Sequence, residues 1–145
     1  MDILMLTPAD YPLLSELLDV YKEVFGLAEY VKPPADYLQQ VLENPVVQFW
    51  VARYEGEVIG GLTAYVMPSV YFPAEEVYLY DLAVRASYQR QGVGMLLLQG
   101  LKDYCSRSGV KEIFVQADLP DKHAIDFYLK NGGVPEDVIH FSFAI

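Results

Sequence analysis

The chain is poor in cysteine, histidine and basic residues: its 145 residues include one Cys, two His and ten Lys or Arg. A single cysteine excludes an internal disulfide framework. One Cys and two His, far apart along the chain, make no recognisable zinc site, so we expect no metal. No apolar run reaches the ~18 residues that a membrane span needs. Because no basic-then-apolar leader opens the chain, we expect a cytoplasmic location and no membrane partner.

The shortage of basic residues leaves a net charge of −10. Nucleic-acid binding requires clustered Lys and Arg that neutralise phosphates, so we expect no nucleic-acid partner. An acidic protein attracts cationic substrates by electrostatic steering. Solubility alone is the alternative explanation for any one acidic residue.

The chain length is typical of one domain, so we expect a single domain over residues 1–145. Strand-like patterns predict strands over residues 3–6, 48–54, 58–67, 76–84, 111–117 and 138–143. Apolar residues at helical spacing predict helices over residues 8–25, 34–42, 92–107 and 121–130. Thr7 is the expected N-cap of the first helix. The resulting order, β-α-α-β-β-β-α-β-α-β, indicates an α/β (α+β) fold.

The most informative segment, residues 80–94, is an apolar strand followed by a polar turn and by Gly92 and Gly94, which open a helix. Glycine lets the backbone approach a ligand closely, and the first N–H groups of a helix have no intrahelical partner. Together they form an anion site suited to a pyrophosphate. Neither the full Gly-x-Gly-x-x-Gly of a dinucleotide fold nor the Gly-Lys-Ser/Thr of a P-loop is present.

Two motifs carry a resemblance. Gln89-x-x-Gly92-x-Gly94 resembles the coenzyme A pyrophosphate loop of the GNAT superfamily of N-acetyltransferases, although an ordinary glycine-rich turn would share the pattern. Downstream, residues 124–133 resemble the superfamily's Ala-x-x-Phe-Tyr helix and its glycine cap, with Gly133 where the family usually has Phe. The resemblance implies one mixed central sheet flanked by helices, and acetyl-CoA as cosubstrate.

The same resemblance implies the cofactor contacts. The acetyl-pantetheine arm would lie along the strand before the loop, with the main-chain N–H of Leu82 as oxyanion donor. The expected cofactor-binding residues are Leu82, Ala83, Val84, Gln89, Arg90, Gln91, Gly92, Val93 and Gly94.

Segments 58–68, 78–84, 115–118 and 136–141 are similar to the aminoglycoside 3-N-acetyltransferase branch of the superfamily. This similarity implies that Asp81 holds the attacked amine. Because Asp81 stands in the strand that leads into the loop, it is also the candidate base that takes the proton, directly or through water. Tyr128 lies where the superfamily's Phe-Tyr motif has its tyrosine, which implies that it donates a proton to the thiolate. A surface carboxylate and a core tyrosine are the alternatives. Asp118 would hold a polycation, and the weaker substrate-binding candidates are Asp121, Glu136 and His140, for which a solvated charge or a helix cap competes.

The acceptor stays open between an aminoglycoside, a polyamine, an amino acid and a peptide amine, and a non-catalytic coenzyme A-binding module is a further alternative. The expected shape of the acceptor pocket depends on loops 27–34 and 68–75. The apolar segment Val138–Ile145 could pair across a homodimer. Cys105, on a helical face with other apolar residues, is expected to be a buried core thiol.

Overall fold

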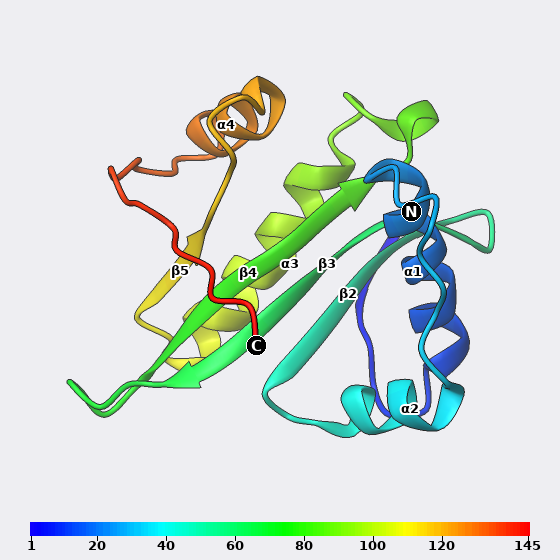
Figure 1. The fold of residues 1–145 in the computed structure, drawn as a ribbon, viewed down its shortest axis with the longest axis horizontal. Helices are drawn as coiled ribbons and strands as arrows, with labels where there is room; N and C mark the ends of the chain where they lie inside the picture. The colour runs from blue at the N-terminus through cyan, green and yellow to red at the C-terminus, as the bar shows by residue number, and fades with distance from the viewer.

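The computed structural model describes all 145 residues and contains one sheet with the strand order β1-β2-β3-β4-β5. Neighbouring strands are antiparallel except β4 and β5, which are parallel, so the sheet is mixed as predicted. The strands are β1 (Asp2–Met5), β2 (Val47–Tyr54), β3 (Glu57–Pro68), β4 (Glu75–Val84) and β5 (Glu112–Val115). The helices are α1 (Tyr11–Val24), α2 (Ala35–Glu43), α3 (Val93–Ser108), α4 (Lys122–Lys130) and a short 3₁₀ turn (Ala86–Tyr88) (Figure 1).

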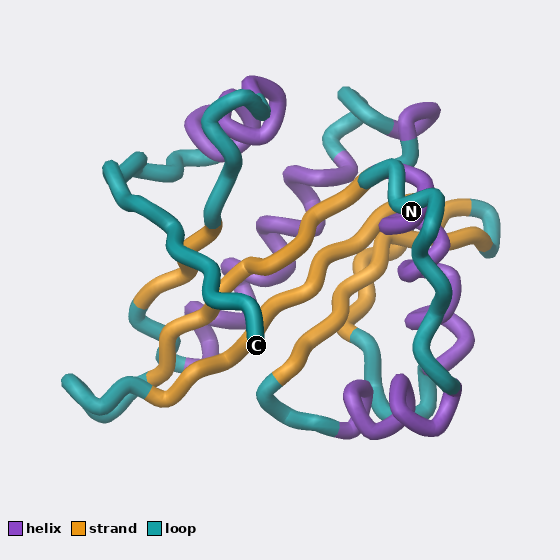
Figure 2. Tube along the Cα trace, viewed as in Figure 1, coloured by secondary structure: helices purple, strands orange, loops and turns teal.

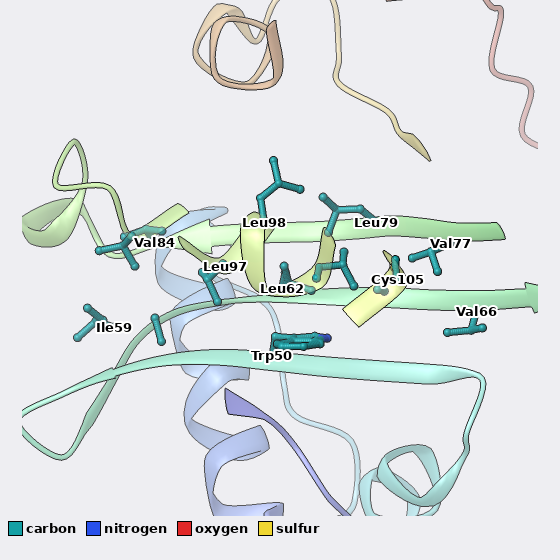
Figure 3. Packing of buried hydrophobic residues seen from close by; sticks show 14 residues of the cluster. Trp50, Ile59, Leu62, Val66, Val77, Leu79, Val84, Leu97, Leu98 and Cys105 are labelled. Atoms are coloured by element: carbon teal, nitrogen blue, oxygen red, sulfur yellow. The ribbon is translucent and has the colours of Figure 1, made fainter. Parts of the chain in front are cut away.

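Separate hydrophobic clusters cover the two faces of the sheet. On β2, Trp50 and Ala52 belong to one cluster, whereas Phe49 and Val51 belong to the other, because successive side chains of a strand point to opposite faces. The first cluster is closed by α3 (Figure 3), and the second by α1 and α2. The helices therefore hold both faces of the central strands out of water.

Two glycine-dependent features fix helices in place. At Gly61 of β3 an added Cβ would overlap the Leu17 side chain and the Trp50 carbonyl, so glycine is what lets α1 pack this closely on the sheet. Helix α3 lies between Gly92 and Gly109, which both have left-handed backbone angles, and this confirms the predicted helix to within a residue at each end. Burial raises the pKa of the Cys105 thiol on α3 to about 11, so this cysteine is a protonated core residue.

The first helix begins later than the sequence predicted. Asp10, not Thr7, is its N-cap residue, and the helix starts at Tyr11 with Pro12 in its first turn. The Asp10 carboxylate instead accepts hydrogen bonds from the Thr7 N–H and hydroxyl, both at 2.7 Å. This side-chain turn competes with helix formation over residues 7–10.

The predicted last strand, Val138–Phe143, is not formed. Helix α4 ends in a Schellman motif, in which the Gly132 N–H donates to Leu129 and the Gly133 N–H to Tyr128. Beyond it, residues 134–145 make no backbone–backbone hydrogen bond, and every residue from 132 onward is exposed. Figure 2 shows the chain after α4 as loop to its C-terminus. A strand needs a neighbouring strand for its N–H and C=O groups, and no strand of the chain pairs with this segment. None of the helices is long and apolar enough to span a membrane.

Candidate active site

An opening in the sheet lies where β4 and β5 diverge. β5 pairs with β4 only over Glu76–Leu79, so the second half of β4 has no neighbouring strand on that side. The pairing with β3 also shifts there: Thr63 lies opposite Asp81, whereas Ala64 lies opposite Leu79. A bulge of this kind changes the direction of the side chains on the strand that carries it. In Figure 1 the chain leaves β5 away from β4 and leads to α4 above the opening.

A cavity of about 460 Å³ occupies this opening and brings together residues that are far apart in the sequence. Strand β4 contributes Asp81 and Leu82, and α4 contributes Tyr128. The turn after β5 adds two further acidic residues, Asp118 and Asp121. The rest of the wall is Phe25, Leu27, Tyr80, Gln116, Ala117 and Ala124.

Asp81 is held by a short polar chain that reaches across the sheet. Thr63, directly opposite on β3, hydrogen-bonds with the Asp81 carboxylate, and its hydroxyl lies 2.8 Å from the hydroxyl of the buried Tyr21 of α1. Burial raises the pKa of the Asp81 carboxyl, while the hydrogen bond from Thr63 opposes that rise. The sequence motifs do not single out Thr63 and Tyr21, although a threonine inside the apolar run of residues 58–67 is a usable signal.

Tyr128 is held beside Asp81 by the packing of α4 on α3. Its neighbour Phe127 contacts α3 at Gly94, where an added Cβ would lie only 3.2 Å from the Phe127 ring. Gly94 therefore serves helix packing as well as the loop. Burial, followed by the charges of Asp121 and Asp81, raises the pKa of Tyr128 to about 12, so its hydroxyl is protonated at neutral pH.

Only some of the other residues and loops predicted to bind the acceptor amine line the cavity. The Asp121 carboxylate accepts a hydrogen bond from the Ala124 N–H at 3.0 Å, so it caps α4 and also lines the cavity. Glu136 and His140 do not line the cavity: both are exposed on the segment after α4, where the His140 ring lies 3.2 Å from the Ser142 hydroxyl. Loop 68–75 is likewise absent from the wall, whereas Leu27 belongs to it as expected.

The loop between β4 and α3 has the geometry of an anion site. Arg90 and Gly92 both have positive φ angles, +59° and +83°. The N–H groups of Arg90 to Met95, six in a row, donate to no acceptor in the chain. A Cβ on Gly92 would meet nothing nearer than the Met95 methyl at 3.8 Å, so the space in front of the loop is open. Such a row of free N–H groups at a helix N-terminus fits a phosphate chain.

The side chains of this segment hold the loop rather than face a ligand. The Gln89 amide donates to the Val84 carbonyl at 2.8 Å, and the Gln91 amide donates to Ser87 at 2.9 Å. The Arg90 guanidinium lies 3.4 Å from the His123 ring on α4. Ala83, Val84 and Val93 are buried, which leaves only their backbone groups for a cofactor. No group of three or more His, Cys, Asp or Glu side chains is placed to hold a metal ion.

Known acetyltransferases share the sequence pattern and the fold of this chain. The model of the acetyltransferase (GNAT) family matches residues 14–133. A crystal structure of an aminoglycoside acetyltransferase from an uncultured soil metagenomic sample, in complex with sisomicin, superposes with a TM-score of 0.97 at 33% identity and covers 99% of this chain and 95% of that one. A second aminoglycoside acetyltransferase from such a sample gives a TM-score of 0.94 at 34% identity, over 99% and 97% of the two chains.

A more distant relative is the probable N-acetyltransferase 14 of Danio rerio, which is 27% identical over 92 residues. Those residues are 59% of this chain but only 29% of the fish protein. The chain therefore spans less than a third of that relative's length.

Proposed function

The chain belongs to the acetyltransferase (GNAT) family and is an N-acetyltransferase, and from that premise we propose that it acetylates an amine of an aminoglycoside, at the 3-N position. The observation that carries the proposal is the cavity that three acidic residues, Asp81, Asp118 and Asp121, line together with Tyr128. An acceptor with several ammonium groups satisfies several carboxylates at once, whereas a monoamine satisfies one. A neighbour at TM-score 0.97 was crystallised with sisomicin, which supports this class of acceptor.

The free N–H groups of Arg90 to Met95 would hold the pyrophosphate of acetyl-CoA, which supplies the acetyl thioester. From that loop, the half of β4 that has no β5 neighbour leads directly to the cavity. We assign the main-chain N–H of Leu82 to the oxyanion that forms as the amine attacks. Such a donor is worth about 10²–10³ in rate.

Asp81 has two tasks in this mechanism. Its carboxylate orients the acceptor ammonium, and it takes the proton that must leave before the nitrogen can attack, directly or through one water. The pKa of Asp81, raised by burial, lies nearer that of an amine than the pKa of a surface carboxyl does. Thr63 fixes the carboxylate in position from the neighbouring strand.

Tyr128 donates to the sulfur as the thioester breaks. With a pKa of about 12 the hydroxyl is a weaker acid than a thiol, so its role is a hydrogen bond to the developing thiolate more than complete proton transfer. Asp121 and Asp81 contribute to that raised pKa. An acceptor cation between them offsets their charge and makes the phenol a better donor when substrate is bound.

The test is release of free coenzyme A from acetyl-CoA in the presence of single amines: sisomicin, spermidine, alanine and a short peptide. We expect turnover with sisomicin at a kcat/KM well above the other three, and NMR of the product should place the acetyl group on the 3-amine. Acetylation of only the polyamine, amino acid or peptide would reject the proposed acceptor, and no turnover with any amine would leave a coenzyme A-binding module.

Two variants locate the chemistry. Asp81→Asn should lower kcat/KM for sisomicin by at least about 100-fold, partly recovered between pH 7 and 9 as neutral amine becomes available. The matched control is Asp126→Asn, an exposed aspartate of α4 outside the cavity, which should keep wild-type activity. If both variants behave alike, Asp81 is not the group that handles the amine.

A further inference from the structure

Tyr21 carries a hydroxyl into the apolar cluster between α1 and the sheet. Tyr21 and Thr63 are 7% and 4% exposed, and the 2.8 Å contact between their hydroxyls is the only hydrogen bond that the Tyr21 side chain makes. Phenylalanine would fill the same space without the cost of removing a hydroxyl from water. Packing alone therefore does not account for the phenol oxygen.

The close approach of α1 to β3 brings these two hydroxyls together. Glycine at position 61 lets the Leu17 side chain contact β3 directly. Tyr21 lies four residues after Leu17, on the same face of α1, and Thr63 lies two residues after Gly61, on the same face of β3. The next turn of the helix therefore places Tyr21 over Thr63.

The direction of the hydrogen bonds follows from the number of available protons. An ionised carboxylate only accepts hydrogen bonds, so the Thr63 hydroxyl is the donor in its bond with Asp81. A threonine hydroxyl has a single hydrogen. Once that hydrogen is donated to Asp81, Thr63 can only accept from Tyr21. Burial raises the pKa of Tyr21 well above its usual value, so the phenol keeps its proton and remains the donor.

We propose that Tyr21 is a positioning residue for acetyl transfer, given the role proposed above for Asp81, and that it acts through Thr63. The Thr63 hydrogen engages one carboxylate oxygen at a time and leaves the other oxygen for the acceptor ammonium. A donor to Thr63 stops its hydroxyl from rotating away, and hydrogen bonds in a chain strengthen one another. Tyr21 thus orients the carboxylate although it does not itself line the cavity.

The ring of Tyr21 has a second task at the cavity. Its centroid lies 5.5 Å from that of the Phe25 ring, and Phe25 belongs to the cavity wall. The hydroxyl therefore supports the Asp81 carboxylate, whereas the ring supports the apolar wall beside it. Removal of the hydroxyl alone and removal of the whole ring should affect different kinetic constants.

The pH dependence of acetyl transfer reports on the hydroxyl. Thr63 is the only side chain that hydrogen-bonds with the Asp81 carboxylate, and a hydrogen bond to the ionised form of a carboxyl lowers its pKa. Loss of the Tyr21 hydroxyl should therefore raise the pKa of Asp81 and move the acidic limb of the pH–rate profile to higher pH. The substitution leaves the other titratable groups around Asp81 in place, namely Tyr65, Tyr78, Tyr80, Asp118, Asp121 and Tyr128.

The kinetic test uses sisomicin and acetyl-CoA. Tyr21→Phe should lower kcat at pH 7 by about 3–10-fold, leave KM for acetyl-CoA unchanged, and move the acidic limb to higher pH. Tyr21→Leu should in addition raise KM for sisomicin above that of the phenylalanine variant. The matched control is Tyr11→Phe, which removes a hydroxyl from the same helix, beside the same cluster and outside the cavity, and should behave as wild type.

A double-mutant cycle tests whether Tyr21 acts through Thr63. Thr63→Val keeps the shape and removes the donor to Asp81, so the addition of Tyr21→Phe should cause no further loss of kcat. Thr63→Ser, which keeps the hydroxyl, should keep the wild-type pH profile, and circular dichroism should show that all variants are folded. Losses that multiply in the double variant would overturn the proposal, as would wild-type kcat and pH profile in Tyr21→Phe.

A titration without turnover distinguishes failure of this proposal from failure of the proposed function. The carbon-13 carboxyl signal of Asp81, followed by NMR, should titrate at higher pH in Tyr21→Phe than in wild type and be unchanged in Tyr11→Phe. An unshifted Asp81 titration in Tyr21→Phe would overturn the present proposal whichever amine is the acceptor. Full activity in Asp81→Asn would instead reject the role proposed for Asp81.

Discussion

Asp81 sits where its ionised form is disfavoured, and this has a consequence for stability. Burial raises its pKa in the folded chain above the value near 3.9 of an unfolded aspartate. The folded state therefore binds this proton more tightly. The contribution to stability is present below pH ~3.9 and is lost as the pH rises through the raised pKa. At neutral pH the charge is carried at the expense of stability.

We therefore expect Asp81→Asn to raise the melting temperature at pH 7 by a few degrees, ~2–5 °C, while it removes activity. The gain should shrink when the pH is lowered toward 4, because wild-type Asp81 then becomes neutral too. Differential scanning calorimetry of both proteins between pH 4 and 8 measures the difference. A gain that is constant over that range would mean that the carboxylate charge is not its origin.

Tyr128 offers a test in which only one oxygen changes. Tyr128→Phe should lower kcat by about 10²–10⁴ and leave acetyl-CoA affinity within a few-fold of wild type. The matched control is Tyr104→Phe, because Tyr104 is a partly buried tyrosine packed edge-on against Trp50 and lies outside the cavity. Stopped-flow single turnovers would separate the chemical step from product release. Full activity in the Tyr128 variant would assign that side chain to packing alone.

At the level of elements, the packing of the fold does not by itself explain the geometry of the loop before α3. Gly92→Glu should abolish measurable coenzyme A binding, since the side chain enters the open space before the free N–H groups and its carboxylate repels phosphate. Positive φ adds strain of about 1–3 kcal/mol to the same change. Calorimetric titration with coenzyme A is the measurement.

Gly109→Glu separates these two effects. Gly109 has φ +75° and no atom within 4 Å of an added Cβ, so the substitution carries similar strain at the other end of α3. This variant should lose similar stability and keep its coenzyme A affinity. Equal loss of binding in both variants would indicate damage to α3 instead of a blocked phosphate site.

The elements show what a sequence reveals and what it does not. Both ends of α3 could be predicted because a glycine with positive φ stands at each. The divergence of β4 from β5 could not be, since it depends on pairing between segments about 35 residues apart. The prediction of a final strand was wrong for a related reason. Alternation at Ile139, Phe141 and Phe143 is typical of the two faces of a strand, but it does not show whether a neighbouring strand exists to pair with it.

The candidate site was partly predictable. The strand before the loop and the Phe-Tyr motif predict Asp81 and Tyr128, similarity to the aminoglycoside branch predicts Asp118 and Asp121, and all four line one cavity. Thr63 and Tyr21 were missed because their importance lies in a contact between β3 and α1. Similarity of sequence predicts Glu136 and His140 as acceptor-binding residues, yet both are exposed and neither lines the cavity.

For the whole molecule, the net charge of −10 acts oppositely on the two proposed ligands. Raising NaCl from 50 to 500 mM should raise KM for a polycationic aminoglycoside several-fold, because steering and attraction to the cavity carboxylates are screened. KM for the anionic acetyl-CoA should fall or stay unchanged, because general repulsion is screened as well. Steady-state kinetics at five salt concentrations measure both slopes. A rise in both would show that salt acts on the protein's stability rather than on charge attraction.

The close contact between Gly94 and Phe127 should also couple the residues that relatives of this protein carry at these two positions. A methyl group at position 94 would press on the ring that holds α4 in place, and Tyr128 is the next residue. Lineages that acquire alanine at position 94 are therefore expected to carry a smaller residue than phenylalanine at position 127, or an α4 shifted outward. An alignment of many relatives should show these two positions substituted in concert, although they are over thirty residues apart in the chain.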